Sequence, residues 1–207
     1  FDAVTLAPPF GLDYPNLHLI FCCDCPNDPA VRLVDSLIQA HPHVSTQLLI
    51  GRNPATANPK LNNLLKAWPR IETDWLILAD SNVEMPPDYV QRLLACWRPE
   101  TGAMCAPPIG ARAQDFAGEI ECAFLNTYQA RWQYASDSVG FGFAQGKSML
   151  FRRRMLADAG GLIALGAEVA EDAAATKVVR GMGLKVQLVD APFPQPLGPR
   201  KLRQVWD

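Results

Sequence analysis

The fold is decided by the stretch Trp75–Asn82, which reads WLILADSN. Its first five residues, Trp75–Ala79, are apolar without alternation, a pattern typical of a strand that is covered on both faces. The run ends abruptly in Asp80, so polar groups begin at the carboxyl end of the strand. A doubly covered strand predicts a layered α/β protein with helices on both sides of the sheet.

Apolar runs and amphipathic stretches alternate on either side of this strand. Further strands are predicted at His18–Cys23, Gln47–Ile50, Ala103–Ala106, Ser148–Phe151 and Lys185–Val189. Helices are predicted from Asp28-Pro29 to about His41, from Pro86-Pro87 through Trp97, and over Gln114–Tyr134, Arg154–Ala159 and Ala170–Arg180, with Asn58-Pro59-Lys60 in a loop. We therefore expect a mainly parallel central sheet flanked by helices, in a single domain over residues 1–207.

Composition and charge argue against some classes of function. The 207 residues are 49% hydrophobic and 19% charged, which is ordinary for a globular α/β protein. A net charge of −2 gives no electrostatic case for nucleic acid as a partner. No run of about eighteen apolar residues occurs, so no spanning segment is predicted within the chain.

Three acidic clusters follow or precede predicted elements: Asp24 with Asp28, Asp80, and Glu171-Asp172. Ligands of open α/β sheets bind outside the carboxyl ends of the strands, and Mg²⁺ is commonly shared between carboxylates and substrate phosphates. Asp80 is the best candidate for such a site. Each cluster also has a structural interpretation: Asp28 as a helix cap (favoured), Asp80 as a turn residue, and Glu171-Asp172 as a complement to a helix dipole.

An ordered series of short motifs resembles the ceramide glucosyltransferase family and its bacterial hopanoid-associated relatives. The series comprises Ile50-Gly51, Asn58-Pro59-Lys60-Leu61-Asn62-Asn63-Leu64, Asp80-Ser81, Val139-Gly140-Phe141, Gly146–Arg152, Ala159–Ala164 and Ala170-Glu171-Asp172. The matches keep their order over about residues 20–190, and their order is more specific than any one of them.

The resemblance implies a GT-A fold and the transfer of a hexose from a UDP-sugar to a lipid hydroxyl with inversion, assisted by Mg²⁺ or Mn²⁺. It implies that Asp172 is the general base and that Asp80, with Asn82, holds the metal. On the donor side it places Asp24 or Asp28, which the alignment does not separate, together with Lys60 and Asp80. To the acceptor side or to supporting roles it assigns Glu171, Gln129, Trp132, Gln145 and Gly146.

The chain also departs from the family pattern. Gln129 stands where animal enzymes carry a His, and Trp206 follows Val205 rather than Arg. The family's Gln/Arg-x-x-Arg-Trp motif is therefore expected beyond Asp207. Both ends look truncated, so we expect membrane segments outside this chain and a location at the cytosolic face of a membrane.

Two other functions compete with this interpretation. A nucleotidyltransferase would share the sheet and the acidic site, but Pro8-Pro9-Phe10-Gly11 is not a basic, glycine-rich phosphate loop. A catalytically inactive sugar- or lipid-binding module is the other alternative. The helix that carries Phe124, Tyr128, Trp132 and Tyr134 would line a lipid groove or, the interpretation favoured by the sequence, pack in the core.

Overall fold

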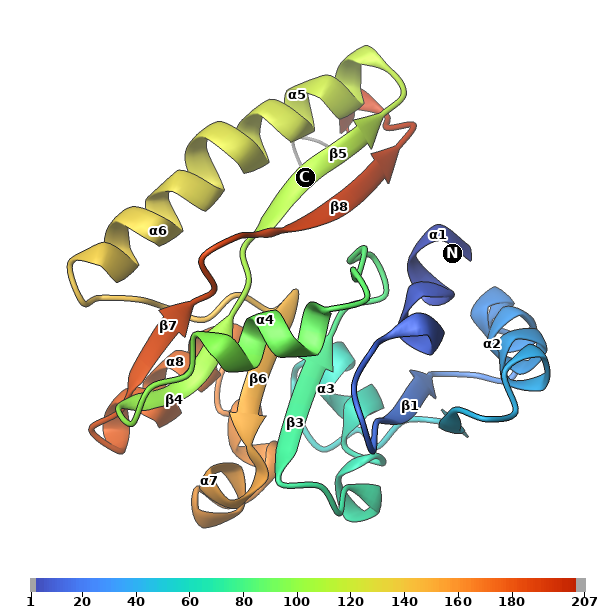
Figure 1. The fold of residues 1–207 in the computed structure, drawn as a ribbon, viewed down its shortest axis with the longest axis horizontal. Helices are drawn as coiled ribbons and strands as arrows, with labels where there is room; N and C mark the ends of the chain where they lie inside the picture. Colours follow the sequence, from blue (N-terminus) through green and yellow to red (C-terminus); the bar gives the residue numbers. More distant parts are fainter. Residues whose placement is uncertain (1–2, 204–207) are drawn as a thin grey trace.

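A four-stranded sheet forms the centre of the computed structural model, which describes residues 3–203. Its strands lie in the order β3-β6-β4-β7 (Figure 1). Their bounds are Trp75–Ala79 for β3, Ser148–Arg152 for β6, Thr101–Cys105 for β4 and Lys185–Leu188 for β7. The strand predicted from the apolar run at residues 75–79 is thus confirmed.

The expectation of a mainly parallel central sheet is wrong for this sheet. β6 runs antiparallel to both β3 and β4, and only β4 and β7 are parallel. After β4 the chain leaves the sheet along β5 (Pro108–Ala113) and returns along a long helical segment to the same end of the sheet, so β6 enters in the opposite direction (Figure 1). Strand direction depends on this connection, which local sequence does not encode.

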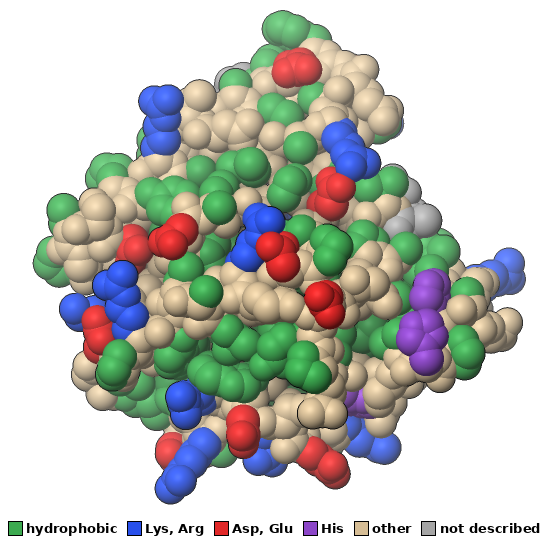
Figure 2. Space-filling model, viewed as in Figure 1, with side chains coloured by type: hydrophobic (Ala, Val, Ile, Leu, Met, Phe, Trp, Pro, Cys, Tyr) green, Lys and Arg blue, Asp and Glu red, His purple; other side chains and the backbone are tan. Residues whose placement is uncertain are grey.

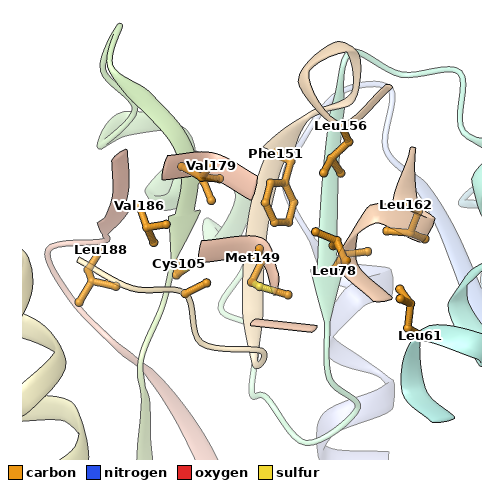
Figure 3. Packing of buried hydrophobic residues seen from close by; sticks show 14 residues of the cluster. Leu61, Leu78, Cys105, Met149, Phe151, Leu156, Leu162, Val179, Val186 and Leu188 are labelled. Atoms are coloured by element: carbon orange, nitrogen blue, oxygen red, sulfur yellow. The ribbon is translucent and has the colours of Figure 1, made fainter. Parts of the chain in front are cut away.

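Helices cover both faces of the sheet, as predicted. On one face Met104 and Leu150 pack with α4 (Tyr89–Ala95). On the other face Cys105 and Met149 pack with α3, α7 and α8 (Figure 3). These three helices span Pro59–Leu64, Arg153–Asp158 and Glu171–Gly181. Adjacent strand residues therefore point into different cores, which explains the apolar runs without alternation. The fold is a mixed α/β arrangement of three layers.

A second, two-stranded sheet lies beyond β3. β1 (His18–Cys23) and β2 (Ser45–Ile50) pair in parallel and pack against α2 (Pro29–Ala40). Asp28 caps α2, because its Oδ1 accepts a hydrogen bond from the amide of Ala30 at 2.9 Å. The predicted cap is confirmed. The remaining short helices are α1 (Ala3–Leu6), η1 (Pro8–Gly11), η2 (Trp68–Arg70) and η4 (Leu162–Gly166).

The loop expected at Asn58-Pro59-Lys60 is instead the start of α3. Asn58 accepts a hydrogen bond from the amide of Leu61 through Oδ1 at 2.9 Å, and Pro59 occupies the first helical turn. A capping side chain followed by proline is a strong start signal, and it brings Lys60 onto a helix.

The third sheet was not predicted. β5 pairs in parallel with β8 (Phe193–Gly198), whose Pro194 and Pro196 argue against a strand in the sequence. One long helical segment covers this pair, made of α5 (Phe116–Phe124), the π-helical turn η3 (Leu125–Gln129) and α6 (Ala130–Ser138). Asn126 fastens the segment to β5 through hydrogen bonds to the amide and carbonyl of Gly110 at 2.7 and 3.1 Å.

The aromatic side chains of this segment are mostly outside the core. Phe116, Phe124, Tyr128 and Trp132 are between 54% and 76% exposed, so the core-packing interpretation is wrong for Phe124, Tyr128 and Trp132. Tyr134 differs, because it is half-buried and its hydroxyl donates to the carbonyl of Val189 at 3.0 Å. An exposed aromatic row on one helical segment is therefore available for contact with a ligand.

A cavity of about 1190 Å³ separates β1 from β3. Among the described residues β1 pairs only with β2 and β3 only with β6, so the edges that face the cavity are unpaired. Although β1 reads as an apolar run, five of its six residues are only half-buried. The carboxyl ends of both strands open into the cavity, which therefore includes the place where the sequence predicts a ligand.

The surface and the helices fit the composition. Figure 2 shows acidic and basic side chains interspersed over one face rather than gathered by sign. Within residues 3–203 no helix combines the length and apolar character needed to cross a bilayer. Trp206, which follows Val205 rather than the Arg of the family motif, lies outside the described residues.

Candidate active site

The donor-side residues predicted from sequence lie on one cavity. Asp24, Asp28, Lys60, Asp80 and Asn82 all line the space between β1 and β3. Asp24 pairs with Arg52 at 3.5 Å, but both side chains are more than half exposed, so this ion pair contributes little to stability. Asp28 keeps its capping role and lines the cavity as well. Both therefore remain candidates for the nucleoside end of a donor.

Asp80 forms ion pairs with two lysines, one at each of its carboxylate oxygens. Lys60 Nζ lies 2.5 Å from Oδ1, and Lys147 Nζ lies 3.0 Å from Oδ2. Lys147 reaches Asp80 because β6 is antiparallel to β3: the residue after β3 lies opposite the residue before β6. The amide of Asp80 accordingly donates to the carbonyl of Lys147 at 3.0 Å.

Lys60 joins α3 to the sheet and to α8. Besides Asp80, its ammonium group contacts Glu171 Oε1 at 2.5 Å and donates to the carbonyl of Gly146 at 2.7 Å. Burial acts to lower the pKa of Lys60, but Asp80 and Glu171 outweigh burial and hold that pKa above its ordinary value. Lys60 is therefore a positively charged residue that holds Asp80, Glu171 and Gly146 together.

Glu171 is a buried carboxylate, and each of its two oxygens has a partner. In addition to Lys60, it accepts a hydrogen bond at 2.8 Å from Nδ2 of Asn58, the cap of α3. Burial acts to raise the pKa of Glu171, but the bonds from Lys60 and Asn58 outweigh it and lower that pKa. Glu171 thus fastens the start of α8 to the start of α3, a role beyond complementing a helix dipole.

Asp172 approaches the same cluster from the other side of Gly146. Its Oδ2 accepts a hydrogen bond from the amide of Gly146 at 3.3 Å, while the carbonyl of Gly146 accepts from Lys60. A Cβ on Gly146 would lie 2.6 Å from Glu171 Oε1, which is closer than real contacts allow. A side chain at position 146 would therefore force Glu171 to shift away from its contacts with Lys60 and Asn58.

A second cavity, of about 490 Å³, opens beside Asp172. Three other residues predicted from sequence line it: Gln129, Trp132 and Gln145. Tyr128 and Phe143 add aromatic walls. The cavity also touches Gln133, which is 1% exposed and whose amide oxygen and nitrogen have no hydrogen-bond partner among the described residues. The acceptor-side residues thus gather around the predicted base.

The oxygen donors around Asp80 fit a shared cation rather than a protein-only cage. Asp80 supplies one carboxylate and Asn82 one amide oxygen, and no group of three or more His, Cys, Asp or Glu side chains capable of holding a metal occurs within residues 3–203. Mg²⁺ commonly takes one or two carboxylates and completes its shell with water and phosphate oxygens. The residues present fit a divalent cation that is bound together with a diphosphate.

Sequence reasoning missed three residues of the site. Asn58 and Lys147 lie within the quoted motifs, but their partners, Glu171 and Asp80, are more than sixty residues away. Gln133 lies one turn beyond Gln129 on the same helical segment. Position within or near a motif was the only sequence signal for these residues. Their contacts with Glu171 and Asp80 depend on the tertiary structure.

Comparison with known proteins supports the family suggested by the motifs. The sequence model of Glycosyl transferase family 21 matches residues 3–207. Ceramide glucosyltransferase 1 of Caenorhabditis elegans is 26% identical over 185 residues, which cover 88% of this chain and 40% of that protein.

Two fungal relatives match a shorter stretch more closely. The ceramide glucosyltransferase of Komagataella phaffii is 38% identical over 84 residues, 39% of this chain and 16% of that protein. That of Candida albicans is 37% identical over 86 residues, 36% of this chain and 16% of that protein. The chain spans about two fifths of the length of the nematode relative. Because the family model covers nearly the whole sequence, the chain belongs to Glycosyl transferase family 21.

Proposed function

We propose that this chain is the catalytic part of an inverting GT-A glycosyltransferase that moves a hexose from a UDP-sugar to the hydroxyl of a lipid such as ceramide. The observation that carries the proposal is the position of Gly146. Its carbonyl accepts from Lys60, which lines the first cavity, and its amide donates to Asp172, which lines the second, so one residue links the two sides of the site.

On the donor side the chain supplies charge of both signs. Lys60 and Lys147 are cations suited to a diphosphate, and Asp24 and Asp28, which line the same cavity as Asp80, are the candidates for binding the nucleoside. A divalent cation bound at Asp80 and Asn82 would offset the negative charge that grows on the leaving diphosphate. Family membership and this donor set support the proposed UDP-sugar.

On the acceptor side Asp172 is the proposed general base. Inversion requires a base on the face of the sugar opposite the leaving group, so that the hydroxyl attacks in line as it loses its proton. Asp172 is half-buried on the wall of the second cavity, with Gln145 beside it and aromatic side chains around the opening. Apolar walls next to a base suit a hydroxyl carried by a lipid chain.

The relatives' names support a lipid acceptor, and the acceptor would be drawn from a membrane. We place the parent protein at the cytosolic face, attached through segments outside this chain. Cell fractionation of the full-length protein tests the attachment: recovery of all of it in the soluble fraction would contradict this part of the proposal.

The decisive experiment replaces the proposed base. Asp172→Asn in the full-length protein removes a proton acceptor while preserving size, so turnover should fall by about 10²–10⁴-fold with UDP affinity retained. Asp158→Asn, at an exposed position on α7, is the matched control and should leave turnover unchanged.

Two outcomes would count against the proposed mechanism. If Asp172→Asn melts at a lower temperature yet keeps near-normal turnover, Asp172 is structural. If the unmodified full-length protein binds UDP and lipid but transfers no sugar from any UDP-hexose, the domain is a binding module instead.

A further inference from the structure

The two lysines on Asp80 differ in how fully they are bound. An ammonium group has three hydrogens to donate, and Lys60 places them on three acceptors: Asp80, Glu171 and the carbonyl of Gly146, all within 2.7 Å. Lys147 contacts only two acceptors among the described residues, Asp80 Oδ2 at 3.0 Å and Asn82 Oδ1 at 3.3 Å. Lys60 is saturated, whereas Lys147 is held loosely.

Both of the Lys147 partners are the residues that fit a divalent cation. The ammonium group of Lys147 therefore occupies the position where Asp80 and Asn82 would turn their oxygens toward a metal. A cation of charge +2 on Asp80 would repel a neighbouring ammonium strongly at contact distance, even at the effective dielectric constant of about 20 typical of proteins. Lys60 is also held by Glu171 and the carbonyl of Gly146, whereas Lys147 has no acceptor besides these oxygens among the described residues, so Lys147 is the lysine that a metal would displace.

The charges of the cluster balance before any ligand arrives. Glu171 and Asp80 carry two negative charges, Lys60 and Lys147 carry two positive charges, and Asn82 is neutral. A divalent cation that arrives with a diphosphate keeps this balance. An ammonium group displaced from Asp80 then has an anion within the same cavity.

The backbone of Lys147 is fixed, so only its side chain has to move. Its carbonyl accepts from the amide of Asp80, and its amide donates to Gln145 Oε1 at 2.8 Å. Ser148, the next residue, begins β6 and is fully buried. The lysine is thus a side chain on a rigid support, in contact with Asp80 on the cavity wall.

From these contacts we propose that Lys147 is an exchangeable counter-ion. In the ligand-free site it neutralises Asp80 and donates a hydrogen bond to Asn82; when the donor binds with its metal, Lys147 leaves these oxygens and binds the diphosphate. Lys60 stays in place and holds Asp80 to Glu171. This inference rests on the proposed function for the nature of the donor, but it assigns a role to a residue that has none in the motif that contains it or in the comparisons.

The proposal predicts opposite effects of one substitution on two ligands. Lys147→Met should bind Mn²⁺ more tightly than the unmodified chain in the absence of nucleotide, because no ammonium has to be displaced. At saturating Mn²⁺ the same variant should bind UDP about tenfold or more weakly, because it loses a charge-assisted contact with the diphosphate. Electron paramagnetic resonance of free Mn²⁺ measures the first affinity and calorimetry with UDP the second.

Two further variants separate this role from a general loss of charge or of fold. Lys185→Met, at the exposed start of β7, should change neither affinity. Lys147→Arg keeps a cation and should retain most of the UDP affinity at saturating Mn²⁺. Melting temperatures of all variants establish that each one is folded.

Different results would contradict the role of Lys147 and the nature of the donor. If Lys147→Met leaves Mn²⁺ affinity unchanged or lowers it, or if neither chain binds Mn²⁺, the counter-ion role is wrong. If the unmodified chain binds Mn²⁺ but no UDP, the donor assignment fails, and the Mn²⁺ comparison still decides whether Lys147 competes for Asp80.

Discussion

Gly146 is the residue on which the geometry of the site depends most directly. Its amide and carbonyl face Asp172 and Lys60, and no space for a side chain exists beside Glu171. We predict that Gly146→Ala costs about 1–3 kcal/mol of folding free energy, the usual range for overpacking a fixed position. Chemical denaturation measures it.

The matched control is Gly181→Ala, at the end of α8, where a Cβ would meet no atom within 4 Å. Because alanine is the better helix former, this control should be neutral or slightly stabilising. Equal stability losses in both variants would show that the close approach of Gly146 to Glu171 is not the cause.

At the residue scale the sequence predicted individual site residues better than it predicted their partners. Asp80 and Asp28 were recognisable because each stands beside a strand or helix signal. The contact between Lys147 and Asp80 was not predictable, because it requires β6 to run antiparallel to β3. Gln133 gave no signal at all, since a glutamine on a helix is ordinary and its unpartnered amide appears only in three dimensions.

At the scale of helices and strands, Glu171 at the start of α8 binds Lys60 and Asn58 at the start of α3. Its pKa is lowered despite burial, because Lys60 and Asn58 stabilise the charged form. A lowered pKa stabilises the fold above the ordinary value of 4.5 and loses this contribution as pH falls through the folded-state value. Glu171→Gln should therefore lower the melting temperature at pH 7, with a difference that shrinks below about pH 4.

Thermal melts between pH 7 and pH 3 test this, with Glu119→Gln on the exposed side of α5 as the control. A gap between Glu171→Gln and the unmodified chain that stays constant with pH would show that packing, not charge, explains the loss.

The elements themselves were predictable wherever their signal was local. Continuous apolar runs gave β3 and β6, and Asp28-Pro29 gave the start of α2. The pair of β5 and β8 was hidden by prolines, which a strand tolerates when its edge is free. The same reasoning mistook Asn58-Pro59 for a loop, although that pair satisfies the chemistry of a helix start.

For the whole molecule, the separation of β1 from β3 has a consequence in solution. Each strand presents a row of backbone groups without a partner strand among the described residues, flanked by half-buried apolar side chains. Such edges readily pair with a strand from another molecule. We predict that the 207-residue chain self-associates as its concentration rises, and that Leu19→Lys on β1 reduces this effect in static light scattering.

Val169→Lys, which adds a charge at an exposed apolar residue off these strands, should change self-association little. A particle mass that is independent of concentration, or one that responds equally to both lysines, would contradict the prediction. If the prediction holds, colloidal behaviour rather than unfolding sets the concentration at which this chain can be handled, and a charge added on the unpaired strand edge extends that range.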